Sequence, residues 1–205
     1  MNFWLHPARA LNRSQALVLG STALIITAVL ASVAGLVNDG ALDIHYHALS
    51  GLSQAPQERW LHNFAQGLAN LAWSSLALLV ASHLIKAPVA WLDWVAYIAL
   101  ARWPLVLISA YLAIPLVSEQ ITELSGALQS LDVNDGNHVM APASHLLPAI
   151  KLLLWSLPSL AGLAWIVWLM FDAYCHLTQT RGTRTVLSFI GAVISAQLMS
   201  QLTIF

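Results

Sequence analysis

The chain has few charged residues and a single cysteine. Lys, Arg, Asp and Glu make up only 8% of its 205 residues, whereas soluble domains carry about 25%. One cysteine excludes an intramolecular disulfide framework and any metal cage built from several thiolates. The eight basic residues are scattered and form no basic face that could follow a phosphate backbone. We therefore expect neither a soluble domain nor a nucleic-acid partner.

Long apolar runs take the place of the missing charges. Hydrophobic residues make up 59% of the chain, and the mean hydropathy is +0.72. A helix of about 20 apolar residues spans the roughly 30 Å of bilayer hydrocarbon. Five stretches meet this length, which predicts an all-α integral membrane protein with a five-helix transmembrane bundle: residues 16–37, 67–85, 92–116, 150–171 and 185–205. Without a linker, repeat or low-complexity tract, residues 1–205 are expected to form one membrane domain.

The distribution of Lys and Arg near the helix ends predicts the orientation. Five basic residues fall on the side of the N-terminus: Arg9, Arg13, Lys86, Arg181 and Arg184. Only Arg59 and Lys151 fall on the other side. This bias predicts a cytoplasmic N-terminus, an outer C-terminus and a place in the plasma membrane, the inner membrane of a bacterium. Aromatic residues at span ends are expected interfacial anchors, among them Trp91, Trp94, Trp168 and Tyr174.

The second predicted outer loop contains a short amphipathic pattern. Its apolar residues recur at helical spacing: Ile121, Leu124, Leu128 and Leu131. An amphipathic helix at the outer membrane surface and a cap packed over the bundle both fit this spacing.

Arg102 lies within the third predicted span, where a fixed charge is costly. Such a residue normally faces protein, a polar partner or a wet cavity rather than lipid. On the second span four polar residues share one helical face: Asn63, Gln66, Asn70 and Ser74. We expect this polar stripe to be the neighbour of Arg102.

Acidic partners for Arg102 are also available in the sequence. Asp39 or Asp43 would reach it if the first loop folds back into the bundle, and Asp93 would serve if the guanidinium snorkels inward. Three roles remain open for Arg102: a structural pin through buried hydrogen bonds, a pathway or anion site, and simple snorkelling.

Two prolines and a run of small residues shape the spans. Pro104 and Pro158 each remove a backbone donor inside a span, which predicts kinks and frees the carbonyls of Leu100 and Leu154. Small residues recur in the first span at Ala23, Thr27, Ala31 and Gly35, and in the fifth at Ala192, Ala196 and Ser200. Such faces allow close approach of another helix. They predict a homo-oligomer or a complex with another membrane protein.

A metal site is an alternative for the first outer loop. Asp43, His45 and His47 form the core of a group of imidazoles and carboxylates that could hold zinc or copper. The spacing matches no strong metal motif, so the sequence by itself predicts no cofactor.

Three short segments give the chain a resemblance to a known family. They are Pro7, then Asp39 to His45 with the sequence DGALDIH, and Ala101 to Pro104 with the sequence ARWP. With five predicted spans, they resemble bacterial members of the Yip (Ypt-interacting protein) domain family. The resemblance implies a five-helix bundle without catalytic residues that acts as a membrane scaffold or accessory protein, in some cases beside an export system. GTPase binding, seen in eukaryotic relatives, is not expected here, because the long cytoplasmic N-terminal segment is missing.

The leading hypothesis is therefore a non-enzymatic membrane scaffold or accessory protein associated with a transport or export system. No nucleophile motif, P-loop or dinucleotide fingerprint is present. One alternative is a small transporter or channel that uses Arg102 and the polar stripe. The other is a metal-binding membrane protein or enzyme that uses the outer His and Asp cluster.

Overall fold

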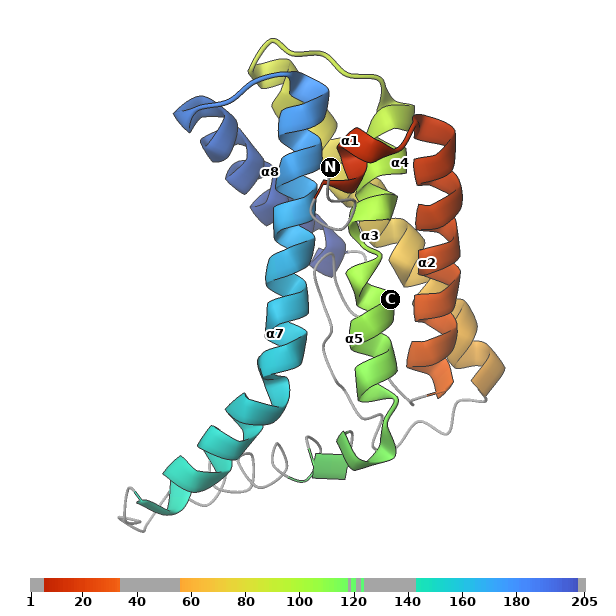
Figure 1. Ribbon diagram of the computed structural model, residues 1–205, viewed down its shortest axis with the longest axis vertical. Helices are drawn as coiled ribbons and strands as arrows, with labels where there is room; N and C mark the ends of the chain where they lie inside the picture. The colour runs from red at the N-terminus through yellow and green to blue at the C-terminus, as the bar shows by residue number, and fades with distance from the viewer. Residues whose placement is uncertain (1–5, 34–55, 118, 121–122, 124–142, 203–205) are drawn as a thin grey trace.

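The computed structural model describes residues 6–33, 56–117, 119–120, 123 and 143–202 (Figure 1). This part of the chain contains helices and no strand. The helices are α1 (Pro7–Ala10), α2 (Arg13–Val33), α3 (Pro56–Leu84), α4 (Trp91–Ala101), α5 (Pro104–Leu112), α7 (Ala143–Thr178) and α8 (Thr183–Leu202).

Four of the described helical segments are long and apolar enough to cross a membrane: Arg13–Val33, Trp60–Leu84, Trp91–Leu112 and Leu153–Thr178. The chain is accordingly an all-α, multi-pass membrane protein by length and composition. α8 coincides with the predicted fifth span, residues 185–205. Its crossing of the membrane, and the orientation of the bundle, stay predictions.

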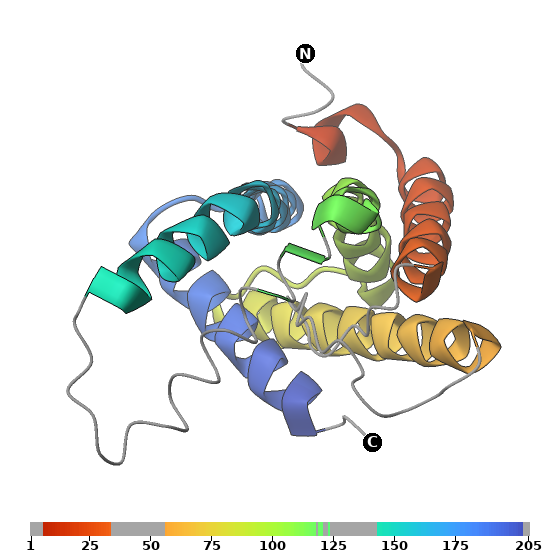
Figure 2. The same cartoon turned by 90° about the horizontal axis from the view of Figure 1, so that it is seen from below.

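The segment formed by α4 and α5 occupies the centre of the bundle. Figure 2 shows α2, α3 and α7 arranged around it. Apolar side chains of α3, α4, α5 and α7 share one continuous core. The beginnings of α1, α2, α4 and α8 and the ends of α3 and α7 meet at one end of the molecule, at the top of Figure 1. We call it the basic end, because it carries Arg9, Arg13, Lys86, Arg181 and Arg184.

α8 runs obliquely across α3 rather than parallel to α7 (Figures 1 and 2). Its small residues Ala192, Ala196 and Ser200 are all buried. Ser200 reaches Asn70, which is the central residue of α3, fourteen residues from each helix end. The fifth predicted span therefore buries its small face against α3, as its spacing predicts.

Two helices extend beyond the membrane spans predicted for them. The predicted second span begins at residue 67, but α3 begins at Pro56, and Asn63 and Gln66 before Gly67 are buried in the bundle within this helix. The predicted fourth span, residues 150–171, lies inside the much longer α7, which is helical from Ala143 to Thr178. Hydropathy detects lipid-compatible side chains, whereas a helix continues wherever its polar residues find partners.

Two of the four expected interfacial anchors lie in the core instead. Trp94 is fully buried, as is Tyr174, and their rings stack at 5.5 Å between α4 and α7. Trp91 and Trp168 remain exposed, as the anchor role requires.

Candidate functional site

Arg102 lies in a break between α4 and α5, and this break is caused by Pro104 two residues later. Pro104 has no backbone N–H and cannot continue the helical ladder. Arg102 and Trp103 donate to the carbonyls of Ala99 and Leu100, three residues earlier, at 3.2 and 3.1 Å. The predicted interruption at Pro104 is confirmed, but the expected free carbonyl of Leu100 is wrong because this tighter turn satisfies it.

The second proline acts differently. α7 continues through Pro158 without a break in the helix. Figure 1 shows α7 changing direction in its N-terminal half, the half that contains Pro158. A bend at this place agrees with the predicted kink.

The Arg102 side chain is buried against α3, with only 6% of its surface exposed. Its Nη2 donates to the Asn70 carbonyl and to the Ser74 Oγ, each at 2.9 Å. Its Nη1 donates to the Gly67 carbonyl at 3.5 Å. The guanidinium therefore joins the break between α4 and α5 to two turns of α3.

The four residues of the polar stripe on α3 are all buried: Asn63, Gln66, Asn70 and Ser74. Their side chains extend the network beyond Arg102. Asn63 Nδ2 donates to Ser32 Oγ on α2 at 3.1 Å, and Gln66 Nε2 donates to Asn70 Oδ1 at 3.3 Å. Ser200 on α8 also donates to Asn70 Oδ1. The structure thus links α2, α3, α8 and the break at Arg102 through one buried polar cluster.

A small cavity adjoins this cluster. It lies between α2, α3 and the α4–α5 segment, with Thr27, Asn63 and Arg102 in its wall, and its volume is about 20 Å³. This space holds about one water molecule. A polar wall of this kind gives such a water hydrogen-bond partners, but the cavity is too small for a solute.

The candidate acidic partners of Arg102 fall in different places. Asp93 lies at the basic end, where its Oδ1 is 3.6 Å from Arg13 Nη1. The expectation that Arg102 snorkels towards Asp93 is therefore wrong, because the guanidinium finds its partners on α3. Asp39 and Asp43 lie outside the described residues, so their pairing with Arg102 stays a prediction.

The proposed metal ligands Asp43, His45 and His47 also lie outside the described residues, as does the amphipathic pattern of residues 124–131. Among the residues that are described, no group of three His, Cys, Asp or Glu side chains lies close enough to hold a metal ion. The zinc or copper hypothesis stays a prediction.

Comparison of the chain with protein-family models, with curated proteins and with solved structures found no match. The resemblance to the Yip domain family therefore stays a prediction as well.

Gly20, which was not among the predicted site residues, determines how closely α2 approaches α4. A Cβ on Gly20 would lie 2.5 Å from the Ala99 Cβ and 2.7 Å from the Leu100 backbone nitrogen. Only glycine permits this approach to the turn that precedes Arg102. The every-fourth-residue spacing of the first span reaches Leu19 rather than Gly20, but Gly20 lies three residues before Ala23 and so shares its helical face.

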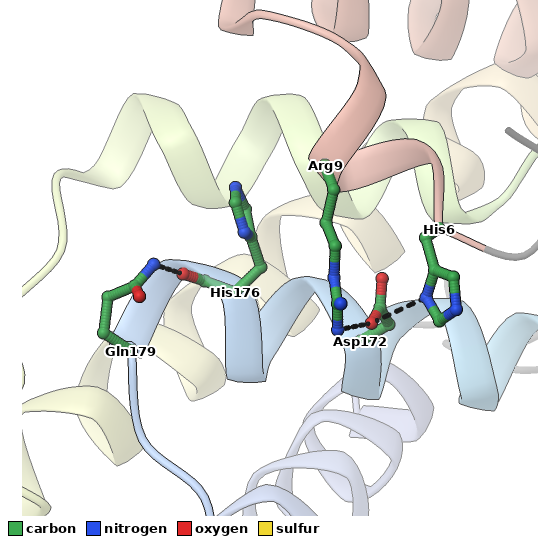
Figure 3. A network of polar contacts seen from close by, with 5 residues as sticks. All are labelled: His6, Arg9, Asp172, His176 and Gln179. Atoms are coloured by element: carbon green, nitrogen blue, oxygen red, sulfur yellow. Dashed lines mark hydrogen bonds and ion pairs between the residues drawn. The ribbon is translucent and has the colours of Figure 1, made fainter. Parts of the chain in front are cut away.

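Asp172, a buried acid near the end of α7, was also not among the predicted site residues. Arg9 Nη2 donates to Asp172 Oδ1 at 2.7 Å, and His6 Nδ1 lies 3.0 Å from the same oxygen (Figure 3). These contacts hold α1 against α7. A lone acid inside an apolar run is a signal that the sequence did contain.

Proposed function

We propose that the protein is a non-enzymatic membrane scaffold or accessory protein whose rigid bundle presents a docking surface to another membrane helix. The observation that carries this proposal is the hydrogen bonding of Arg102 to the main chain and Ser74 of α3. A guanidinium bonded in this way holds the α4–α5 segment and α3 in fixed positions relative to each other. A static centre is the property that a scaffold requires.

The same centre gives less support to a transporter. A substrate path along Arg102 needs space, and the cavity there measures about 20 Å³. Moving the guanidinium would also break three hydrogen bonds, and the adjoining cavity has room for only about one water molecule to replace them.

The proposal includes the finer features expected from the sequence. The bundle crosses the membrane five times, with its basic end in the cytoplasm, in accordance with the excess of Lys and Arg there. The host membrane is the bacterial plasma membrane. Membership of the Yip domain family and association with a transport or export system complete this proposal, and both rest on the resemblance of the short segments.

A groove between α3 and α8 supports the docking role. Its volume is about 460 Å³, and Trp73, Leu76 and Val80 form its wall on α3. On α8 it is lined by Gly191 and Ser195, which are small residues one helical turn apart. A Cβ added to Gly191 would meet nothing within 4 Å. Space beside small residues is what a second helix needs for close packing.

Crosslinking at Gly191 tests the proposal. A photoreactive residue placed there in living cells should give one discrete adduct, because a docked helix lies within reach. An adduct of twice the 22.2 kDa chain mass identifies a second copy, and any other discrete mass identifies a different membrane protein. A smear of lipid adducts alone would contradict the scaffold role.

A matched pair of variants provides the control. Gly191→Leu adds bulk to the groove at a position where a Cβ meets nothing within 4 Å, so the adduct formed from a second probe at Ser195 should disappear. Ile190→Trp adds bulk to the neighbouring exposed position, which does not line the groove, and should leave that adduct unchanged.

A further inference from the structure

A second cavity opens at the basic end, away from the Arg102 cluster and the α3–α8 groove. Its volume is about 390 Å³, within the range of small-molecule sites. α1 contributes His6 and Arg9, the last turns of α7 contribute Asp172 and Cys175, and the turn before α8 contributes Arg181.

The charges in this cavity favour an anion. Asp172 is only 5% exposed and binds Arg9, which itself stays one-third exposed at 33%. Arg181 is exposed and makes no hydrogen bond or ion pair with any part of the chain that the structure describes. Two guanidinium groups therefore face one carboxylate, which leaves an excess of positive charge. Arginine binds phosphate through geometrically matched, charge-assisted hydrogen bonds.

The backbone fixes the position of Arg181. Gly182 follows it with φ of +131°, a conformation that other residues rarely adopt. Asp172 binds the guanidinium of Arg9 and so fixes the position of that side chain (Figure 3). The two cationic groups are thus placed by the fold at the cavity.

The remaining wall is aromatic and belongs to the apolar segment Leu153–Thr178. Phe171 lines the cavity, and Trp168 beside it is half exposed. Asp172 lies six residues before the end of the apolar segment Leu153–Thr178, which corresponds to about 9 Å along the helix. This depth matches the border between hydrocarbon and headgroups, where tryptophan is enriched.

We infer that this cavity binds the phosphate group of a phospholipid, with Arg181 and Arg9 on the phosphate and Trp168 and Phe171 along the start of the acyl chains. Basic pockets between membrane helices bind anionic headgroups by the same chemistry. The shared ligand chemistry is a phosphate ester, which a soluble phosphate compound also carries. The lipid is the proposed source because the aromatic wall lies on an apolar segment long enough to cross a membrane, and Trp168 in that wall is half exposed.

Native mass spectrometry of the full chain in mild detergent tests this inference, with phosphatidylglycerol as the probe. One bound lipid per chain is expected. Arg181→Gln should lower the affinity about tenfold, the loss expected for a charge-assisted hydrogen bond. Arg184→Gln removes an equally exposed arginine that lies three residues away and does not line the cavity, so binding should persist. Equal losses in the two variants would overturn the inference.

The only cysteine of the chain supplies an independent readout on the unaltered protein. Cys175 lines the cavity, so every thiol label reports on this site. Phosphatidylglycerol should slow its reaction with a maleimide severalfold, and glycerol 3-phosphate at the same concentration should not. Protection by glycerol 3-phosphate alone would overturn the lipid as the source, and an unchanged rate with both probes would overturn the site.

Discussion

At the scale of the residue, Arg102 shows how a buried charge is accommodated. A central arginine costs about 2.5–3.5 kcal/mol on insertion scales. Interhelical hydrogen bonds within membranes contribute about 0.6 kcal/mol on average and at most about 1.7 kcal/mol. The three hydrogen bonds to α3 are therefore of the same order as the cost. In the folded bundle these hydrogen bonds stabilise the protein and also hold the break between α4 and α5 in position against α3.

Replacement of Arg102 should separate these contributions. Arg102→Ala should destabilise the folded bundle by about 2 kcal/mol, because three interhelical hydrogen bonds are lost. Arg102→Lys should lose less, since an ammonium keeps the charge and reaches fewer acceptors. Thermal unfolding in detergent measures both changes, with the exposed Arg184→Ala as the control. An unchanged melting temperature in Arg102→Ala would contradict a structural role.

The polar neighbours of Arg102 could be predicted from the sequence, whereas those of Asp172 could not. Asn70 and Ser74 share a helical face with two further polar residues, and periodicity within one helix reveals such a face. Asp172 instead binds Arg9, 163 positions away in the chain. Contacts between distant segments depend on how helices are arranged, and a hydropathy pattern does not contain that information.

At the scale of the element, the close approach of α2 to α4 depends on one missing side chain. Gly20 faces the backbone of Ala99 and Leu100, which cannot move without opening the turn at Arg102. Gly191 on α8 faces open space. The two glycines have opposite roles although both lie within long helices.

Alanine substitution of these two glycines should therefore give opposite results. Gly20→Ala should destabilise the protein by about 1–3 kcal/mol through overpacking against backbone atoms. Gly191→Ala should change stability by less than about 1 kcal/mol, towards greater stability, because alanine favours the helix. Melting temperatures of the two variants in the same detergent provide the comparison. Equal destabilisation would show that helix packing at Gly20 is looser than the structure describes.

Helix existence was predictable from the sequence, but helix ends were not. Apolar runs of about 20 residues predicted the regions of α2, α3, α7 and α8. The third run, residues 92–116, is divided into α4 and α5 near its middle, because Pro104 interrupts the helical hydrogen bonding. Burial of Asn63 and Gln66 extends α3 towards the N-terminus beyond its hydropathic boundary. Polar residues that pack inside a bundle lower local hydropathy without ending a helix.

At the scale of the whole molecule, the helix ends divide into a basic end and an opposite end. Arg9 and Arg13 at the basic end pair with Asp172 and Asp93. The Arg13–Asp93 contact is partly exposed on both sides, so it contributes only about 1 kcal/mol or less. The Arg9–Asp172 contact involves a carboxylate that is only 5% exposed, and a hydrogen bond to a charged group contributes about 1.5–3 kcal/mol. Their joint effect is to fix α1 and the start of α2 on the bundle.

Labelling with a membrane-impermeant maleimide should reveal the orientation. In a Cys175→Ser background, Glu119→Cys at the opposite end should react in intact cells. Pro88→Cys at the basic end should react only after the membrane is permeabilised, because the excess of positive charge keeps that end in the cytoplasm. A reporter peptide attached after Phe205 should be accessible together with Glu119→Cys if α8 crosses the membrane. The reverse labelling pattern would contradict the predicted orientation.

The hydrogen bond between Ser200 and Asn70 sets an order of assembly during synthesis. These residues lie 130 positions apart, and a ribosome adds about 5–20 residues per second. Asn70 is therefore synthesised roughly 6 to 26 seconds before its partner on α8. During that interval α2 to α5 are already made. Gln66 can then bond to Asn70 Oδ1, and Arg102 can bond to the Asn70 carbonyl and to Ser74. The contacts between Arg102 and α3 can therefore form early, and α8 packs later against a surface of α3 that is already in place.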